Sequence, residues 1–316
     1  MTELKGDFPG NQAEFDARFP TEETCREFLF QLRWPDGFRC PNCDASKSWA
    51  LRGERVECSG CGKQVSVTSG TILHKTRKPL RTWFQAMWWI CTQKTGGSAK
   101  GLQRLLGLGS YETAWTWLHK LRRAMILAAR EPLEGLVEVD DAYIGGEEAG
   151  ARGRQSFQKA ALAVAVEVPG PTKRGLGRIR LLHVPDFSAG ALLPFVCENV
   201  REGSHVVTDG WDGYAKLKEA GYCHEVRPGG AELLPHVHLV ISLLKRWLLG
   251  THQGAVRPKQ LQYYLEEFTF RFNRRKSQHA GKIFYRMLQG VGASDPLPYR
   301  EIADRPAKPN YVPYNI

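Results

Sequence analysis

No run of about 18 consecutive apolar residues, the length that a membrane-spanning helix needs, occurs in this 316-residue chain. The first residues, MTELKGDFPGNQAEFD, also lack the basic and apolar regions of a secretory signal. Both absences predict a chain that is neither anchored nor exported. We therefore expect it in a reducing cytoplasm, where cysteines remain thiols that are available to a metal.

Nucleotide-binding loops are absent too. The glycine-rich segments 145–146 and 170–177 have neither the Lys-Ser/Thr ending of a P-loop nor the setting of a dinucleotide-binding fold. We expect neither ATP nor NAD as a cofactor.

Acidic residues are the scarcer charged class, at 33 against 44 basic residues, which gives a net charge of +11. This balance predicts a polyanionic partner, and nucleic acid is the commonest one. A membrane surface is the weaker alternative.

Four of the eight cysteines form two Cys-x-x-Cys pairs, Cys40 with Cys43 and Cys58 with Cys61. Each pair turns two sulfurs toward one point, so the four predict a tetrahedral zinc ribbon, with a redox or disulfide role as the weaker alternative. With no open coordination position, the Zn²⁺ is expected to be structural. The remaining cysteines stand apart in apolar settings and are predicted to be buried thiols: Cys25, Cys91, Cys197 and Cys223.

Helical patterns surround the predicted ribbon. Residues 12–35 read as a helical segment, residues 38–72 as the ribbon, and residues 79–130 as helices, with Ser98 and Ser110 as N-caps. The stretch from Ser98 to Met125 has the outline of a helix-turn-helix, whose basic second helix suits DNA. An ordinary helical hairpin with a solvated basic face is the alternative.

Short strand patterns begin near Leu136. Strands are predicted at 136–140, 160–168, 178–184 and 204–208, with a helix at 189–200 before the last. Three antiparallel strands followed by a crossover helix and a parallel strand match the opening of a ribonuclease H-like fold. In that fold Asp140 and Asp209 become neighbours. The predicted class is thus α+β and multidomain: zinc ribbon, helix-turn-helix-like region and ribonuclease H-like domain with a mixed sheet.

Two converging carboxylates repel each other and are normally held by divalent metal, so Asp140 and Asp209 predict a Mg²⁺ or Mn²⁺ site for phosphodiester chemistry. The alternative is structural, because Asp209-Gly210 also suits a turn and Asp140-Asp141 a strand end.

A helix beginning near Pro235 would put His238, Ser242 and Lys245 on one face toward these carboxylates, with His236 pointing elsewhere. His238 could instead be a surface or capping residue. A further helix, 258–275, ends in a basic cluster that suits DNA phosphates, and residues after 295 read as an irregular tail.

The chain resembles bacterial transposases of the insertion-sequence 1595 family, with a zinc ribbon and an ISXO-like DDE domain. The resemblance spans about residues 12–290 and is carried by CPNC with CSGC, SGTILHKTRKPLRTWFQAMW, VEVDDAYIGG, VVTDGWDGY and LLKRWLLGTHQGAVRPKQLQYYLEEFTFRFNRR. It implies bacterial cytoplasmic location, metal-dependent cleavage at element ends and strand transfer into target DNA. Joining two ends implies a homo-oligomer on DNA.

By position, Asp140 and Asp209 match the family's first two acidic ligands, and Lys245 matches a lysine seven residues after the third catalytic position. His238 stands at that third position, where the family commonly has Asn or Glu, so the metal preference is open between Mg²⁺ and Mn²⁺. The basic residues expected to contact DNA are Lys120, Arg122, Arg123, Arg246, Arg271, Arg274, Arg275 and Lys276.

Four regions are expected: 12–75 with the ribbon, 79–130 with the helix-turn-helix, 134–290 with the catalytic domain, and the tail 295–316. Two other functions use the same residues. A nuclease or resolvase would cut without joining, and a non-catalytic DNA-binding relic would keep the ribbon after losing the metal site.

Overall fold

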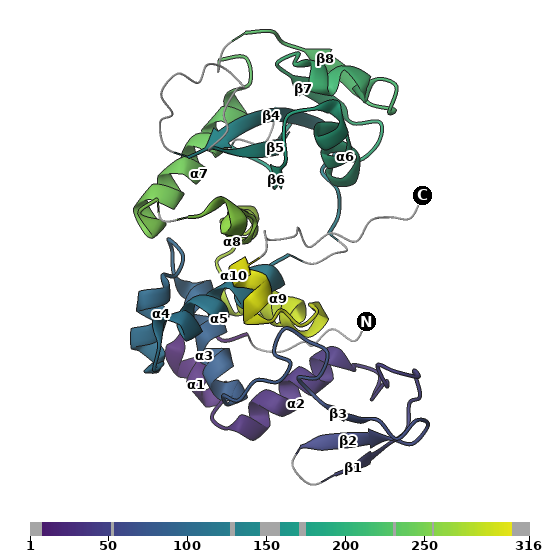
Figure 1. Cartoon of the computed structure of the whole chain (residues 1–316), viewed down its shortest axis with the longest axis vertical. Helices are drawn as coiled ribbons and strands as arrows, with labels where there is room; N and C mark the ends of the chain where they lie inside the picture. The colour runs from purple at the N-terminus through teal and green to yellow at the C-terminus, as the bar shows by residue number, and fades with distance from the viewer. Residues whose placement is uncertain are drawn as a thin grey trace. The chain divides into compact units, whose positions relative to one another are not determined.

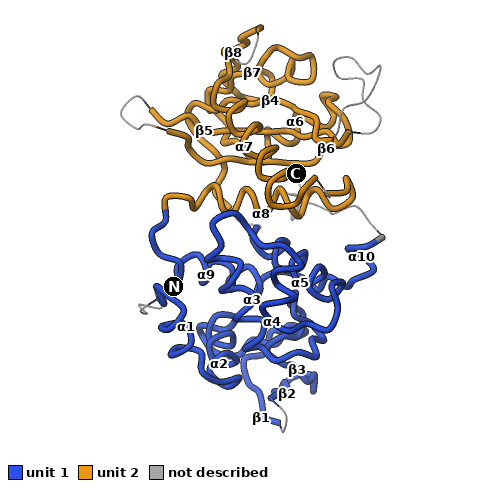
Figure 2. The backbone as a smooth tube through the Cα atoms, turned by 90° about the vertical axis from the view of Figure 1, so that its left-hand side faces the viewer, with its two compact units in different colours: residues 1–127, 277–304 blue, residues 128–276, 305–316 orange. Residues whose placement is uncertain are grey.

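The computed structural model describes residues 8–51, 54–126, 130–145, 159–170, 175–229, 232–254 and 256–304. They divide into two compact units, one built from the chain up to residue 127 together with residues 277–304, the other from residue 128 to residue 276 (Figure 2). The polar N-caps, apolar stripes and strand patterns of the sequence account for most elements of both units.

The first unit opens with two helices, α1 (Gln12–Arg18) and α2 (Glu22–Arg33). The side chain of Asn11 caps α1, and Thr21 forms a capping box with Thr24 on α2, as expected for polar side chains that satisfy the first free N–H groups. The ribbon follows as β1 (Ser48–Ala50), β2 (Arg55–Cys58) and β3 (Gln64–Ser66), which pair antiparallel in that order (Figure 1).

The helical part of this unit contains α3 (Leu80–Thr92), α4 (Ala99–Leu106) and α5 (Tyr111–Ala124). Ser98 and Ser110 cap α4 and α5 as predicted, and α4 ends at Gly107 in the left-handed region, φ 59°, which glycine adopts without steric cost. The indole rings of Trp83 and Trp117 stack with centroids 3.5 Å apart and join α3 to α5.

The helix α9 (Ala280–Ala293) also belongs to the first unit, although the sequence pattern placed residues up to 290 in the catalytic domain. The ring of Phe284 contacts the aromatic cluster of α1 and α3, which explains the difference: Phe15, Phe19, Phe84 and Trp88. A short helix, α10 (Tyr299–Asp304), lies where an irregular tail was predicted, and residues 305–316 are outside the described part of the chain.

The second unit is built on one mixed sheet with the order β6-β5-β4-β7-β8. Its strands are β4 (Leu136–Ile144), β5 (Ala160–Val168), β6 (Ile179–Val184), β7 (His205–Thr208) and β8 (Cys223–Val226). Strands β4, β5 and β6 pair antiparallel, whereas β4, β7 and β8 pair parallel, with α6 (Ala189–Asn199) as the crossover. This confirms the predicted ribonuclease H-like order.

Helices cover both faces of the sheet. On one face, Val137 and Val139 of β4 share a core with α6 and with the 3₁₀ helix η1 (Asp212–Leu217). On the other, α7 (Pro235–His252) and α8 (Leu261–Asn273) pack on Leu162, Val164 and Val166, and the 3₁₀ helix η2 (Pro258–Gln260) directly precedes α8. Because side chains alternate along a strand, Glu138 and Asp140 lie on the α7 face of β4.

Two predictions about cysteines are wrong. Cys25 and Cys91 are buried, but Cys197 and Cys223 are exposed. Cys197 lies on the solvent side of α6, where its neighbours Phe195 and Val196 occupy the core, and Cys223 begins the edge strand β8.

Among the described helices, none combines the length and the hydropathy that a membrane span requires.

Candidate active site

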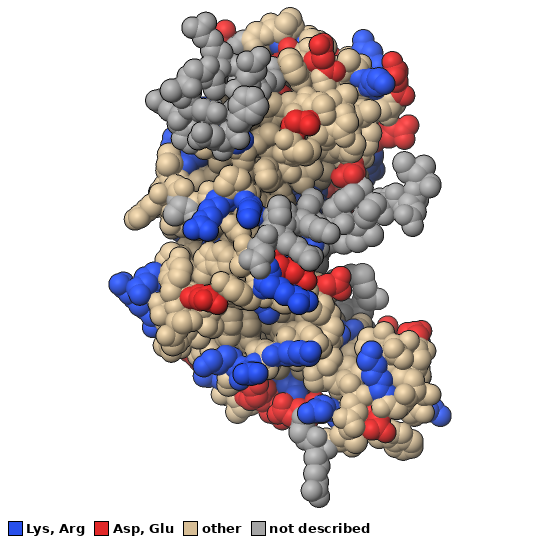
Figure 3. Space-filling view, in the orientation of Figure 1, with Lys and Arg blue, Asp and Glu red and all other residues tan. Residues whose placement is uncertain are grey.

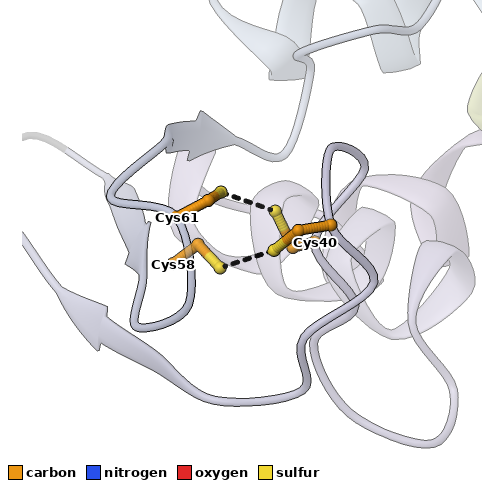
Figure 4. A group of neighbouring side chains, drawn as sticks. Cys40, Cys58 and Cys61 are labelled. Carbon is orange, nitrogen blue, oxygen red and sulfur yellow. Dashed lines mark hydrogen bonds between the residues drawn. The ribbon is translucent and has the colours of Figure 1, made fainter.

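The four ribbon cysteines form a compact sulfur cluster (Figure 4). The Sγ atoms of Cys40 and Cys61 are 3.7 Å apart and those of Cys43 and Cys58 are 3.5 Å apart, and all four lie within 4.8 Å of one another. A tetrahedron with zinc–sulfur bonds of about 2.3 Å has edges of about 3.8 Å. The residues therefore fit the predicted structural Zn²⁺.

The backbone around the knuckles favours thiolates on two of these cysteines. Burial raises the pKa of Cys40, but the backbone N–H groups of Asn42 and Cys43 outweigh it and lower that pKa to about 6. The backbone N–H of Lys63 likewise lowers the pKa of Cys61. For Cys43 the backbone N–H of Ala45 lowers the pKa, yet the neighbouring sulfurs raise it to about 12. Zinc binding would displace that proton.

The register of β4 and β7 brings the two predicted carboxylates to adjacent strands. Glu138 of β4 pairs with Val207 of β7 in parallel, and Asp140 and Asp209 each lie two residues further along. Asp140 is buried, at 4% exposed, and Asp209 is half-buried just past the end of β7. An Oδ1 atom of Asp209 accepts a hydrogen bond of 3.0 Å from the backbone N–H of Trp211, which fixes the turn.

Helix α7 supplies the predicted histidine. The Nε2 atom of His238 lies 3.4 Å from Oδ2 of Asp140, and the His238 side chain is 38% exposed against 6% for Asp140. The core side of the helix is occupied by Val237, Val240 and Ile241, so His238 stands at the edge between core and solvent. The contact brings together two residues that are 98 positions apart in the sequence.

The N-terminus of α7 is held to β4 by Glu138, a residue that the sequence reasoning missed. Its Oε2 atom accepts hydrogen bonds of 2.9 Å from the backbone N–H groups of His236 and Val237, and its Oε1 atom is 2.6 Å from Nδ1 of His236. His236 thus points away from Asp140, as predicted, and toward Glu138. The period of two along β4, which places Glu138 on the face of Asp140, is the signal that could have found it.

Ser242 and Lys245 follow His238 on α7, and both side chains are exposed. The Asp140, Asp209 and His238 side chains are less tightly gathered than the sulfurs. Within the described ranges, only the four cysteines form a group of three or more potential ligands with all donor atoms inside 4.8 Å. The site therefore consists of the contact between the His238 imidazole and the Asp140 carboxylate, with Asp209 following the adjacent strand.

Several basic residues expected to contact DNA also make contacts within the fold. Arg122 is 2% exposed, and its guanidinium donates to the carbonyl of Gly97, so the prediction for this residue is wrong. Arg271 pairs at 2.8 Å with the buried Glu267. Arg274 and Arg275 lie over the rings of Phe270 and Phe272 and donate to the carbonyl groups of the same two residues.

All of these residues except Arg122 keep some exposure. Arg246, Arg275 and Lys276 are exposed, whereas Lys120, Arg123, Arg271 and Arg274 are half-buried. On the face drawn in Figure 3, basic side chains are dispersed among acidic ones and do not form one continuous patch.

The helical hairpin of α4 and α5 is present, but α5 is an interior helix. Seven of its 14 residues are buried, and Trp115 on its outer side contacts the ring of Tyr299 in α10 at 6.3 Å. On α4, Leu102 is buried while Leu105 is 52% exposed. The basic residues of α5 suggested an exposed face, but charge alone does not reveal which face of a helix its neighbours cover.

Comparison with known proteins agrees with this architecture. A family model described as the ISXO2-like transposase domain matches residues 132–273, and one described as a transposase zinc-ribbon domain matches residues 20–64. A Halobacterium salinarum protein, described as an uncharacterized protein in transposable element ISH50, is 27% identical over 278 residues, which cover 80% of this chain and 91% of that protein. No solved structure matches the chain.

The two matched domains occur in the order ribbon then transposase domain, and they coincide with β1 to β3 and with the sheet, α7 and α8. Ribbon, sheet topology and sequence relatives together identify the chain as a member of the insertion-sequence 1595 family of transposases.

Proposed function

We propose that this transposase cleaves DNA at the ends of its insertion sequence and transfers the freed strands to a target phosphodiester. The observation that carries the proposal is the contact of His238 from α7 with Asp140 on β4, beside β7, the strand that Asp209 directly follows. Three potential metal ligands thus come from α7 and from two adjacent strands of one sheet.

The donor set fits a hard divalent cation. Asp140 and Asp209 would hold Mg²⁺ or Mn²⁺ through carboxylate oxygens, and His238 would add a ring nitrogen, which suits Mn²⁺ better than Mg²⁺. Bound metal in such sites supplies an activated oxygen nucleophile and stabilises the leaving oxygen. No ATP or NAD is required, since one phosphodiester is exchanged for another.

The protein's own groups would orient the DNA. Lys245 is exposed seven residues after His238, and a solvated lysine stays charged, so it would contact a phosphate beside the scissile bond. Arg246 and Lys276 would add phosphate contacts that position DNA without reading its sequence. Because two ends must be joined, a homo-oligomer would assemble on DNA.

Cleavage of a DNA that carries the element's ends tests the proposal. Wild type should cut and join strands when Mg²⁺ or Mn²⁺ is added, whereas Asp140→Asn should bind the same DNA and do neither. Cutting without joining would instead indicate a nuclease or resolvase. Binding without cutting would indicate a DNA-binding relic, the alternative favoured by the missing third carboxylate.

A further inference from the structure

A pocket of about 450 Å³ lies between the end of α2 and the outer side of α9, within the first unit. Leu32, Arg33 and Trp34 line it from α2, and Arg286, Gln289 and Ala293 line it from α9. Two arginines and no carboxylate thus face one concavity. It is distinct from both the sulfur cluster and the residues around Asp140.

Arg33 carries a charge that the described residues leave uncompensated. Its Nη1 donates a hydrogen bond of 2.5 Å to the carbonyl of Val67, and its guanidinium lies 4.5 Å from the ring of Trp34. Burial lowers the pKa of Arg33 to about 10, and no described carboxylate lies within 4.0 Å of it. A guanidinium has five N–H donors, so several remain available to an anion.

Two other arginines of the fold have their charge balanced by a carboxylate. Arg271 is paired with the buried Glu267, and Arg178 is paired with Glu167. A partly desolvated cation without such a partner is costly, and an anion entering the pocket would remove the cost. Arg33 therefore differs from Arg178 and Arg271 in lacking a carboxylate partner among the described residues.

The α9 side of the pocket is arranged to admit an anion. Nη1 of Arg286 donates a hydrogen bond of 2.8 Å to Oε1 of Gln289, which holds the exposed guanidinium at the rim. Gly292 leaves room for the stem of Arg33, since a Cβ atom there would lie 3.3 Å from Cγ of Arg33. A larger residue at 292 would push the guanidinium out of its place.

We propose that this pocket binds the DNA backbone, with one phosphate between Arg33 and Arg286 and the adjoining sugar against the apolar wall. The inference rests on the proposed function only in taking DNA as the polyanion. Guanidinium groups match phosphate through paired N–H donors, and the pocket volume exceeds what an isolated phosphate needs.

Its location suggests what binding would do. The carbonyl that Arg33 contacts belongs to Val67, directly after β3 of the ribbon, and Trp34 contacts the ring of Phe38 just before the first knuckle. A phosphate on Arg33 would fix the end of α2 against the ribbon. The pocket would thereby position the ribbon on DNA, which is the role of backbone contacts.

Fluorescence anisotropy tests the proposal in the absence of divalent metal. The probe is a short fluorescein-labelled duplex of arbitrary sequence, titrated with the full chain at several salt concentrations. We expect Arg33→Gln and Arg286→Gln each to weaken binding by roughly ten- to a hundredfold at low salt. Each should also reduce the slope of log affinity against log salt by about 0.9.

Two further variants keep the test decisive. Ala293→Trp should fill the pocket without removing charge and should weaken binding similarly, whereas Arg300→Gln, which removes an exposed arginine of α10, should leave affinity within about twofold. Unchanged affinity and salt slope in both pocket arginine variants would overturn the pocket while leaving the proposed function intact. A wild type that does not bind this duplex would also overturn the pocket, whereas the proposed function is judged separately by cleavage of DNA that carries the element's ends.

Discussion

Nε2 of His238 lies 3.4 Å from Oδ2 of Asp140, so the first turn of α7 is in contact with the middle of β4. The contact would give the candidate catalytic centre a nitrogen donor where the family resemblance led us to expect an oxygen donor. Since imidazole and carboxylate differ in their affinity for Mg²⁺ and Mn²⁺, the contact also makes the metal preference measurable through a single residue.

Replacing His238 by Glu should shift that preference. We expect the ratio of Mg²⁺-supported to Mn²⁺-supported cleavage to rise by about tenfold or more, because a carboxylate is the better Mg²⁺ ligand. Leu239→Glu is the matched control, since it adds the same charge at the next, 50% exposed position. An unchanged ratio in His238→Glu would remove His238 from the metal site.

Glu138 should act through the position of α7. Glu138→Ala removes an acceptor that is 3% exposed and leaves the backbone N–H groups of His236 and Val237 without it. We expect a loss of about 1–3 kcal/mol in the free energy of unfolding, together with slower cleavage.

Urea unfolding measures the stability change, and hydrogen exchange at the amides of residues 236 and 237 locates it. Glu232→Ala, at an exposed position before α7, serves as the control and should alter neither. If Glu138→Ala exchanges these amides at the wild-type rate, Glu138 does not hold the helix.

Zinc removal should unfold the ribbon and spare the second unit. Cys61→Ser takes one ligand from a four-sulfur cluster, so we expect the metal content of the purified protein to fall from one zinc ion per chain to a small fraction. Cys223→Ser changes an exposed cysteine of β8 and should retain full zinc. Equal zinc contents in the two variants would contradict the assignment.

The Glu167–Arg178 pair should make stability depend on pH. Burial raises the pKa of Glu167, but hydrogen bonds from Arg178 and from the backbone N–H of Glu134 outweigh it, so that pKa is lowered on folding. A lowered carboxyl pKa stabilises the fold above the ordinary value, and the gain is lost as the pH falls through the lowered one.

We therefore expect Glu167→Gln to reduce the free energy of unfolding by about 1–3 kcal/mol at neutral pH, and progressively less in acid. Urea midpoints of both proteins across this range give the comparison. A difference that grows toward acid would have the wrong sign for this account.

Local patterns in the sequence were sufficient to predict most helices and strands and the two cysteine pairs of the ribbon. The strand limits of β5 and the caps at Ser98 and Ser110 follow from alternation and polar capping, which depend on neighbouring residues only. The placement of Asp140 and Asp209 on adjacent strands followed from strand order, because connection rules leave few topologies open.

Burial that results from contacts between distant segments was harder to predict from the sequence. Arg122 looked like a surface residue, yet packing around α5 covers it, and Phe284 packs on aromatic rings more than 180 residues away. Neither fact has a periodic signal in the sequence. Glu138 is an intermediate case, since alternation gave its face but not the helix end that it caps.

Strand transfer by the Asp209→Asn variant tests whether this carboxylate is essential for joining DNA. The assay follows joining of a labelled element end to target DNA in Mg²⁺ and in Mn²⁺, with Asp212→Asn, an exposed aspartate three residues further, as the control. We expect wild type and Asp212→Asn to form the joined product, while Asp209→Asn binds DNA equally well and forms none. Joined product from Asp209→Asn at the wild-type rate would contradict this expectation.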